Sequence, residues 1–298
     1  MACDWLFIDG SSLIFRAFYG VPSSVRAPDG RQVNAVRGFL ETMARLLTSR
    51  VPRHIAVATD VDWRPAWRVE LLPGYKAHRT AEPIPPLLIP QMGVIEELLT
   101  AIGVDVIGLA EYEAEDVIAT WTAKTQGTVE IASGDRDLFA LVEQGRVIVL
   151  YPEKSGLAEI DEHEVQRRYG IPGRTYGDFA VLRGDPSDGL PGLKGVGPVA
   201  AAGLIRTYGG IAGLLERGTL SETQRDYLER AMRLVPPVES LSIELPAGRR
   251  NLYPVDKNAA AALGAEHGIP ATVTRLVEAL NRTLVKPSGA PRPNRSRG

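Results

Sequence analysis

The chain has 298 residues, of which 44% are hydrophobic and 23% charged, and its formal net charge at pH 7 is −2. This composition excludes wholesale disorder, and the length allows one large core with an appended lobe, or two domains. No apolar run is long enough to cross a bilayer, and the first residues lack the basic and apolar regions of a signal peptide. Cys3 is the only cysteine, which excludes an intrachain disulfide and favours a reducing, cytoplasmic location.

The first half of the chain predicts alternating strands and helices. Short apolar runs predict strands, and apolar residues at helical spacing predict helices between them. We expect strands at 4–8, 54–58, 104–107, 129–132 and 147–150, and helices at 34–49, 91–101, 113–124 and 137–142. This alternation is typical of βαβ units and predicts an α/β core, with a mostly parallel sheet, over residues 1–172.

The second half has a helical pattern that is interrupted mainly at 184–197, a segment rich in Gly and Pro. We expect helices at 176–182, 199–208, 221–234, 256–268 and 272–284. A boundary near Pro172 would separate the core from a helical lobe over residues 173–284. Residues 285–298 carry basic side chains, prolines and no acid, and are expected to form a disordered basic tail. Either an electrostatic role or solubility alone would explain the charge of this tail.

Acidic side chains follow three of the predicted strands. Asp9 follows the first strand, Asp60 the second, and Asp135 with Asp137 the fourth. Ligands of an open α/β sheet bind beyond the carboxyl ends of its strands, so these loops deliver carboxylates to one edge. Asp62 is an alternative to Asp60, and we prefer Asp60 because it ends the strand directly.

Two more acidic groups complete a set of nine. A predicted helix begins with Glu113, Glu115 and Asp116, where the helix dipole also favours acids, and Asp185 and Asp188 lie in the segment RGDPSDG. Each acid alone is most simply a cap or turn residue. Carboxylates held together, however, repel one another unless their pKa values rise or cations bind. Nine acids are too many for one Mg²⁺ and suit two or more divalent ions, such as Mg²⁺ or Mn²⁺.

The segment between Asp60 and Pro90 interleaves basic and aromatic side chains. These are Trp63, Arg64, Trp67, Arg68, Tyr75, Lys76, His78 and Arg79. A connection of this length between two sheet elements is unusual, and such loops are usually functional. A solvated amphipathic helix with aromatic anchors is the structural alternative.

A glycine-rich turn precedes the predicted helix at 199–208. Glycines let the backbone approach a phosphate closely, and the N-terminus of the following helix offers free N–H groups to it. Pro198 suits the first turn of that helix. Plain turns share this pattern, but the nearby acids favour a phosphate-binding role for Gly192, Lys194, Gly195, Val196 and Gly197.

Six segments carry a resemblance to a known family. They read FIDGSSLIFRAF (7–18), ATD (58–60), LPGYKAHR (72–79), YEAED (112–116), SGDRDL (133–138) and GDPSDGLPGLKGVG (184–197). In this order they resemble the bacterial 5′-3′ exonuclease and flap endonuclease family, which includes the N-terminal nuclease domain of DNA polymerase I. The resemblance covers residues 4–284. It implies a PIN-like 5′ nuclease core, a helical arch near 61–90 and a helix-hairpin-helix element near 184–208, in a free-standing monomer without a polymerase domain.

The resemblance implies two clusters of metal ligands. The first would contain Asp9, Asp60, Glu113 and Glu115, with Asp116 completing it directly or through water. The second would contain Asp135, Asp137, Asp185 and Asp188. Glu115 stands where relatives often have Asp, and Gly189 replaces a frequent Asn, but neither change removes a carboxylate.

The resemblance also implies contacts with DNA. Lys76 and Arg79 are assigned to the scissile phosphate, where cations stabilise developing charge. Phe15 resembles an aromatic on which a terminal base stacks, with a core phenylalanine as the equal alternative. Arg68 would contact backbone phosphate or pack structurally. The glycine turn would hold a duplex through its phosphates, with K⁺ at the turn carbonyls, and therefore with slight sequence preference.

The expected function is hydrolysis of DNA phosphodiesters by a two-metal-ion mechanism in replication and repair. Its substrates would be DNA with 5′ flaps, 5′ ends or nicks, and RNA primer ends. The low net charge argues neither against this function nor for it, because the 34 basic side chains outnumber the acids left once nine are assigned to metal. A shorter PIN-type ribonuclease would lack the glycine turn, and a catalytically silent DNA-junction-binding protein would have lost acids.

Overall fold

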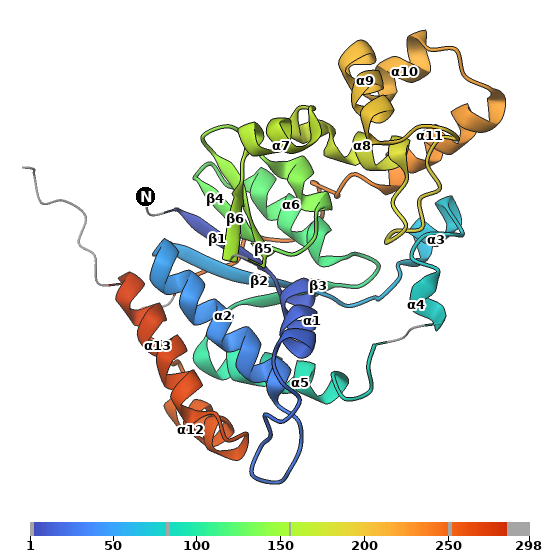
Figure 1. Ribbon diagram of the computed structural model, residues 1–298. Coiled ribbons are helices and arrows are strands. Elements are labelled where there is room, and N and C mark those ends of the chain that lie inside the picture. The colour runs from blue at the N-terminus through green and yellow to red at the C-terminus, as the bar shows by residue number, and fades with distance from the viewer. Residues whose placement is uncertain (1–2, 82–83, 155, 250–251, 285–298) are drawn as a thin grey trace, which may run out of the picture.

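The computed structural model describes residues 3–81, 84–154, 156–249 and 252–284, and the predicted tail lies outside these ranges. A six-stranded sheet forms the centre, in the order β3-β2-β1-β4-β5-β6 (Figure 1). The strands are β1 (Trp5–Asp9), β2 (His54–Asp60), β3 (Val106–Leu109), β4 (Val129–Ala132), β5 (Val147–Glu153) and β6 (Gly156–Ile160). The first five are parallel, which confirms the predicted fold class.

The edge strand β6 was not predicted. It pairs antiparallel with β5, and its exposed residues do not form the apolar run that marks the buried strands. By contrast, every residue of β1 is buried, as expected of a strand covered on both faces.

Two hydrophobic cores lie on the two faces of the sheet, because successive side chains of a strand point to opposite sides. Leu6 and Ile8 of β1 belong to the core with α1 (Gly10–Gly20), α2 (Asn34–Arg50) and α5 (Ile89–Ile102). Trp5 and Phe7 belong to the other core, which contains α6 (Ala114–Lys124) and α7 (Glu162–Tyr169) and continues into the lobe.

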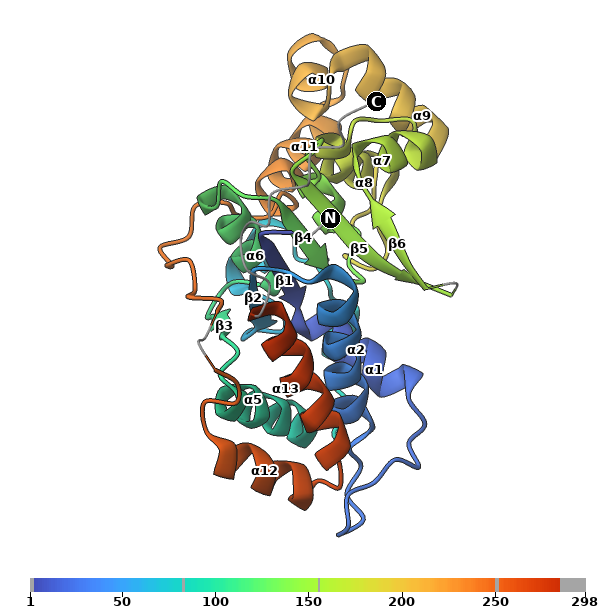
Figure 2. The same cartoon turned by 90° about the vertical axis from the view of Figure 1, so that its left-hand side faces the viewer.

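The lobe contains α8 (Tyr176–Arg183), α9 (Pro198–Tyr208), α10 (Ile211–Arg217) and α11 (Glu222–Leu234). The last two helices, α12 (Lys257–Glu266) and α13 (Pro270–Leu284), lie at the opposite end of the molecule (Figure 2). They pack on α5 and α2, respectively, so the predicted assignment of residues 173–284 to a single lobe is wrong. An amphipathic pattern shows that a helix has an apolar face, but not which surface this face covers.

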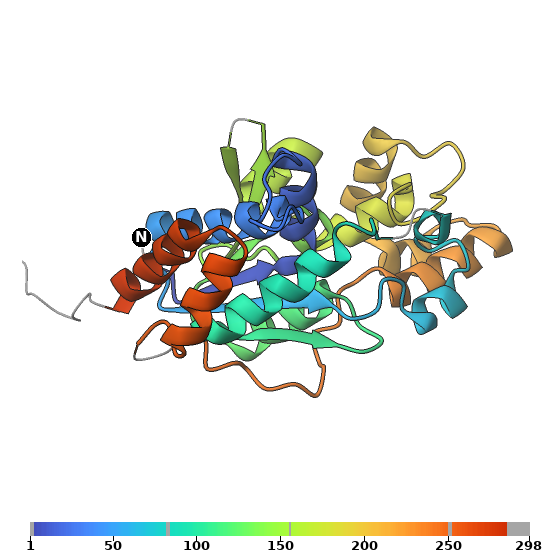
Figure 3. The same cartoon turned by 90° about the horizontal axis from the view of Figure 1, so that it is seen from below.

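The segment predicted as an arch forms two short helices, α3 (Ala66–Leu71) and α4 (His78–Ala81). Figure 3 shows them on the side of the molecule that carries the lobe, and α3 contacts α11. The expected helix at 137–142 is a 3-10 turn, η1 (Asp137–Leu141). In the described ranges no single helix has the length and hydropathy of a membrane span. Helices α9 and α10 have that length and hydropathy only when taken together, and they are separated by a 70° bend.

Candidate active site

A cavity of about 530 Å³ opens at the carboxyl ends of the parallel strands. Six of the nine predicted acids line it: Asp9, Asp60, Glu113, Glu115, Asp135 and Asp188. They come from segments far apart in the chain, so the sheet edge brings them together as the strand positions predicted.

Asp9 is the last residue of β1 and the N-cap of α1. Its Oδ1 accepts from Ser12 N at 3.0 Å and its Oδ2 accepts from Ser133 Oγ at 2.5 Å. Burial, together with the charges of Asp60 and Asp135, raises the pKa of Asp9 to about 7. A carboxylate in this environment is ionised at neutral pH only with difficulty unless a cation is close.

Asp60 ends the neighbouring strand β2. Its Oδ1 accepts from Ala114 N at 2.7 Å, which fixes the side chain at the start of α6. Asp62 lies two residues further on, and its Oδ2 accepts from Glu111 N at 2.5 Å on an exposed turn, away from the cavity lining. The geometry therefore favours Asp60 over Asp62.

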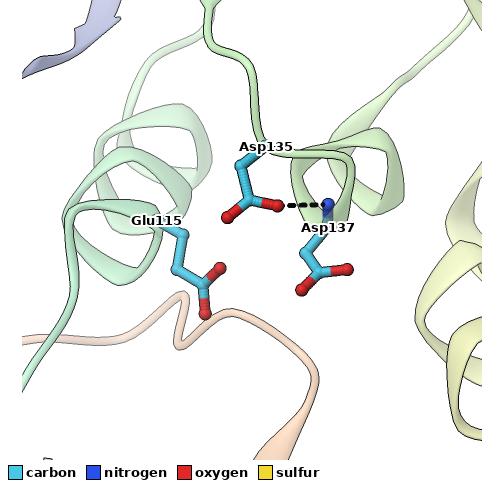
Figure 4. Close-up of side chains that lie close together, drawn as sticks. All are labelled: Glu115, Asp135 and Asp137. Carbon is cyan, nitrogen blue, oxygen red and sulfur yellow. Dashed lines mark hydrogen bonds between the residues drawn. The ribbon is translucent and has the colours of Figure 1, made fainter. Parts of the chain in front are cut away.

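The carboxylates of Glu115, Asp135 and Asp137 lie close enough to share a cation. Each offers an oxygen, and these oxygens lie within 4.8 Å of one another (Figure 4). Burial raises the pKa of all three side chains, and Asp135 and Asp188 raise that of Asp137 further. A largely buried, all-oxygen group with excess negative charge fits a hard divalent ion. Seven of the nine predicted ligands thus lie in or beside the cavity.

Arg68 of α3 is a cation that binds the acids at the start of α6. Its Nη1 donates to Glu113 and, at 2.6 Å, to Glu115, while its Nη2 donates to Asp116 at 2.7 Å. Its side chain is only 1% exposed. This buried position suits the structural alternative for Arg68, and its contact with DNA stays a prediction.

Glu113 is held on both oxygens by groups from the arch. Oε1 accepts from Lys76 Nζ at 2.6 Å, and Oε2 accepts from Tyr75 OH at 2.5 Å and from Arg68. Burial alone would raise the pKa of Glu113, but Lys76 and Arg68 outweigh it and lower the value to about 2. Glu113 is thus ionised and neutralised within the protein.

The structure does not bring Asp116 and Asp185 to the cavity lining. Asp116 Oδ1 accepts from Val238 N at 2.8 Å as well as from Arg68, and its Oδ2 accepts from Glu113 N at 3.0 Å. Asp185 Oδ2 accepts from Arg183 at 2.8 Å. These two acids are occupied by partners that the spacing of the acids could not reveal.

An aromatic stack closes one side of the cavity. The rings of Phe15 and Trp63 lie 4.9 Å apart and nearly parallel, and the guanidinium of Arg79 lies 4.3 Å from the Trp63 ring centroid. Arg79 also donates to Trp63 O at 2.8 Å. The sequence identifies Trp63 only as one aromatic residue of the arch. Its position beside Phe15 depends on how closely α1 approaches the arch.

Serine hydroxyls that the sequence analysis did not single out position the acids. Ser133 Oγ accepts from Asp135 N at 2.9 Å while it donates to Asp9, and Ser11 Oγ accepts from Asp60 N at 2.8 Å. The sequence holds a signal for both: Ser133 directly follows β4 in the SGDRDL segment, and Ser11 lies two residues after the end of β1 in the FIDGSS segment.

The glycine-rich turn projects from the lobe with Lys194 exposed. Gly192 has a φ of 72°, and a Cβ there would lie 2.5 Å from Gly184 N, so no other residue fits this close approach. Gly197 is the N-cap of α9, and Val199 in its first turn is 85% exposed. The free N–H groups of α9 therefore face solvent, as a phosphate-binding helix end requires.

Two family models match the chain in succession. The 5′-3′ exonuclease N-terminal resolvase-like domain matches residues 4–170, and the 5′-3′ exonuclease C-terminal SAM fold matches residues 171–242. The chain belongs to the 5′-3′ exonuclease family. This confirms the predicted resemblance, and with it the identification of the chain as a nuclease.

Relatives in this family include complete proteins of similar length. A 5′-3′ exonuclease of Streptomyces coelicolor is 43% identical over 92% of this chain and 99% of its own length. A 5′-3′ exonuclease of Mycobacterium tuberculosis is 40% identical over 94% and 99%, respectively. DNA polymerase I of Mycobacterium leprae is 38% identical over 85% of this chain but only 29% of the polymerase.

Solved structures share the fold of this exonuclease family member. The T5 D15 protein co-crystallised with metal ions has a TM-score of 0.64 and 17% identity, covering 94% of this chain and 99% of its own. Flap endonuclease-1 from Methanococcus jannaschii has a TM-score of 0.59 and 18% identity, covering 94% of each chain. The overall fold is therefore shared with these proteins.

Proposed function

We propose that this family member hydrolyses phosphodiesters in DNA with 5′ flaps, 5′ ends or nicks, acting as both exonuclease and flap endonuclease. The observation that carries the proposal is the convergence of seven carboxylates at one cavity, with oxygens of Glu115, Asp135 and Asp137 within 4.8 Å of one another. Mg²⁺ or Mn²⁺ are the proposed ions, because the donors are all carboxylate oxygens.

Two groups of side chains would hold the ions. Asp9, Asp60, Glu113 and Glu115 form one group at the ends of β1 and β2 and the start of α6, and an oxygen of Glu115 lies within 4.8 Å of oxygens of Asp135 and Asp137. Asp135, Asp137 and Asp188 form the other. When bound there, divalent ions supply Lewis-acid stabilisation to the attacking and leaving oxygens of a phosphodiester. Glu113 also connects the first group to the arch, because Tyr75 and Lys76 donate hydrogen bonds to its carboxylate.

Cations and aromatic rings of this chain would place the DNA. Lys76 and Arg79 come from the arch beside the acids, where a cation can orient a phosphate and stabilise charge that develops on it. Phe15 and Trp63 offer aromatic surface at the same cavity, and stacking on such surface tolerates any base.

The lobe would bind the DNA duplex at a distance from the phosphodiester that is cleaved. Lys194 and the solvent-facing N-terminus of α9 suit backbone phosphates, and the carbonyls of the turn are the proposed K⁺ ligands. Solved structures of similar fold support a DNA partner, since the T5 D15 flap endonuclease forms a pseudo-enzyme-product complex with DNA and metal ions. We further propose that the protein acts as a cytoplasmic monomer in DNA replication and repair, and that RNA primer ends are also substrates.

Product mapping on a 5′-labelled flap, with Mg²⁺ and with Mn²⁺, tests this function. We expect cleavage close to the junction between flap and duplex, and shorter products from a recessed 5′ end. The same flap made of RNA should also be cut if primer ends are substrates. Absence of cleavage on every DNA substrate with either ion would overturn the proposal, and cleavage of RNA alone would indicate a ribonuclease.

A further inference from the structure

The ammonium group of Lys76 lies among the acids of the cavity. Lys76 Nζ is 2.6 Å from Glu113 Oε1 and 3.7 Å from Asp188 Oδ1, and the side chain is 4% exposed. Glu113 precedes α6, and Asp188 precedes the glycine-rich turn. One buried cation therefore joins acids from the two groups that are proposed to hold different metal ions.

The charge of Lys76 acts on more acids than it contacts. It lowers the pKa of several carboxyl groups against the opposing effect of burial, and these are Asp60, Glu113, Glu115 and Asp135. The ammonium of Lys76 is thus a positive charge placed within a group of carboxylates, 2.6 Å from one and 3.7 Å from another.

The backbone around Lys76 is docked on the loop that carries Asp188. The Lys76 N–H donates to Asp188 O at 3.0 Å, and a Cβ on Gly189 would lie 2.0 Å from Gly74 O. Lys76 has a φ of 45°, a left-handed conformation that costs a residue with a side chain about 1–2 kcal/mol. Contacts with the acids and with this loop must therefore hold the base of the arch in place.

We propose that Lys76 is the resident cation of the metal-free site, and that loading of divalent ions releases it, with the base of the arch, from Glu113 and Asp188. This inference rests on the metal site of the proposed function. An ammonium and a divalent ion cannot both neutralise the same carboxylates at full strength, so each weakens the binding of the other. Lys76 would then be free to bind a DNA phosphate only after the ions are bound. Metal binding would therefore precede this contact with DNA.

Metal affinity in the absence of DNA tests the competition directly. We would titrate Mg²⁺ into the whole wild-type protein and into K76M, with K194M as the matched control on the lobe, and measure the Kd by calorimetry. Coupling between two ligands of this kind is typically about 5- to 150-fold. The inference predicts that K76M binds Mg²⁺ at least about fivefold more tightly than wild type, while K194M is unchanged.

The exposure of Lys76 in the wild-type protein provides a second test, which needs no variant. Acetylation read by mass spectrometry should modify Lys76 slowly without metal and faster with saturating Mg²⁺. The exposed Lys194 should react equally in both states. This measurement decides the question even if K76M does not fold.

The outcomes separate this inference from the metal site itself. If Mg²⁺ binds while Lys76 stays protected, or if K76M binds Mg²⁺ equally or more weakly, the competition is refuted and the metal site stands. If the wild-type protein binds no Mg²⁺ at all, both the inference and the metal site fail.

Discussion

One guanidinium nitrogen of Arg68 lies 2.7 Å from Oδ1 of Asp116, in an ion pair buried on both sides. Arg68 belongs to α3 of the arch and Asp116 to the first turn of α6, so this pair fastens the arch to the core. The same oxygen of Asp116 accepts from Val238 N, which ties the chain segment after α11 to the same point. The acids of α6 therefore serve the assembly of the fold as well as the cavity.

Arg68→Met should destabilise the protein by about 3–5 kcal/mol, because it leaves buried carboxylates without their cation. Urea denaturation of the metal-free protein measures this change. Arg64→Met is the matched control on the arch, since Arg64 donates to the carbonyls of Tyr75 and Pro73, and should cost about 1 kcal/mol. Equal effects of the two substitutions would contradict a special role for Arg68.

Asp137→Ala should lower kcat on a flap by at least about 100-fold, because loss of an ion removes several kcal/mol of transition-state stabilisation. Binding of the flap should remain measurable. Asp62→Asn is the control, since Asp62 lies outside the cavity lining, and should keep near wild-type kcat. Full activity of Asp137→Ala would remove the two-ion interpretation, and loss of activity in Asp62→Asn would reopen the choice between Asp60 and Asp62.

The stabilisation of the folded protein by Mg²⁺ should increase with pH. The pKa of Asp9 is raised from 3.8 to about 7 in the folded protein, so the native state binds a proton that the unfolded chain has released. The free energy of unfolding of the metal-free protein therefore decreases as the pH rises from the unfolded to the folded pKa of Asp9. A divalent ion replaces the proton, so the Mg²⁺-induced rise in Tm should be larger at about pH 8 than at about pH 5. An equal rise at both pH values would show that no such proton is displaced.

Lys194→Ala should weaken binding to duplex DNA and reduce the slope of log Kd against log salt by about 1, as loss of one phosphate contact requires. Fluorescence anisotropy over a range of salt concentrations gives this slope. Lys257→Ala on α12 is the matched control, because α12 packs on α5 at the end of the molecule remote from the lobe. A salt slope that does not change in Lys194→Ala would exclude Lys194 from the phosphate contacts.

Gly192→Ala should destabilise the glycine-rich turn more than Gly195→Ala does. Both glycines have positive φ, 72° and 81°, so both substitutions carry a backbone cost of about 1 kcal/mol. A Cβ at Gly192 would in addition lie 2.5 Å from Gly184 N, whereas nothing lies within 4 Å of a Cβ at Gly195. Thermal unfolding and duplex affinity should separate the two variants, and identical behaviour would contradict the close packing of this turn.

The sequence was sufficient to predict the five parallel strands of the sheet, the family, and the edge at which the acids gather. Buried parallel strands are continuous apolar runs, and the residue after each run lies at the same edge, so Asp9, Asp60 and Asp135 could be placed from local patterns alone. Edge strand β6 and the positions of α12 and α13 could not be predicted in this way. The sequence of each element does not show which part of the molecule it packs against.

Tertiary structure decided which acids are available at the cavity. Asp116 and Asp185 have the same chemistry as Asp137, yet Arg68 with Val238 occupies the first and Arg183 the second. Such partners are set by distances between segments that are remote in the chain. Periodicity and spacing describe only neighbours in the sequence, so the chain itself identifies the carboxylates, while the fold determines which of them are already neutralised by a protein cation.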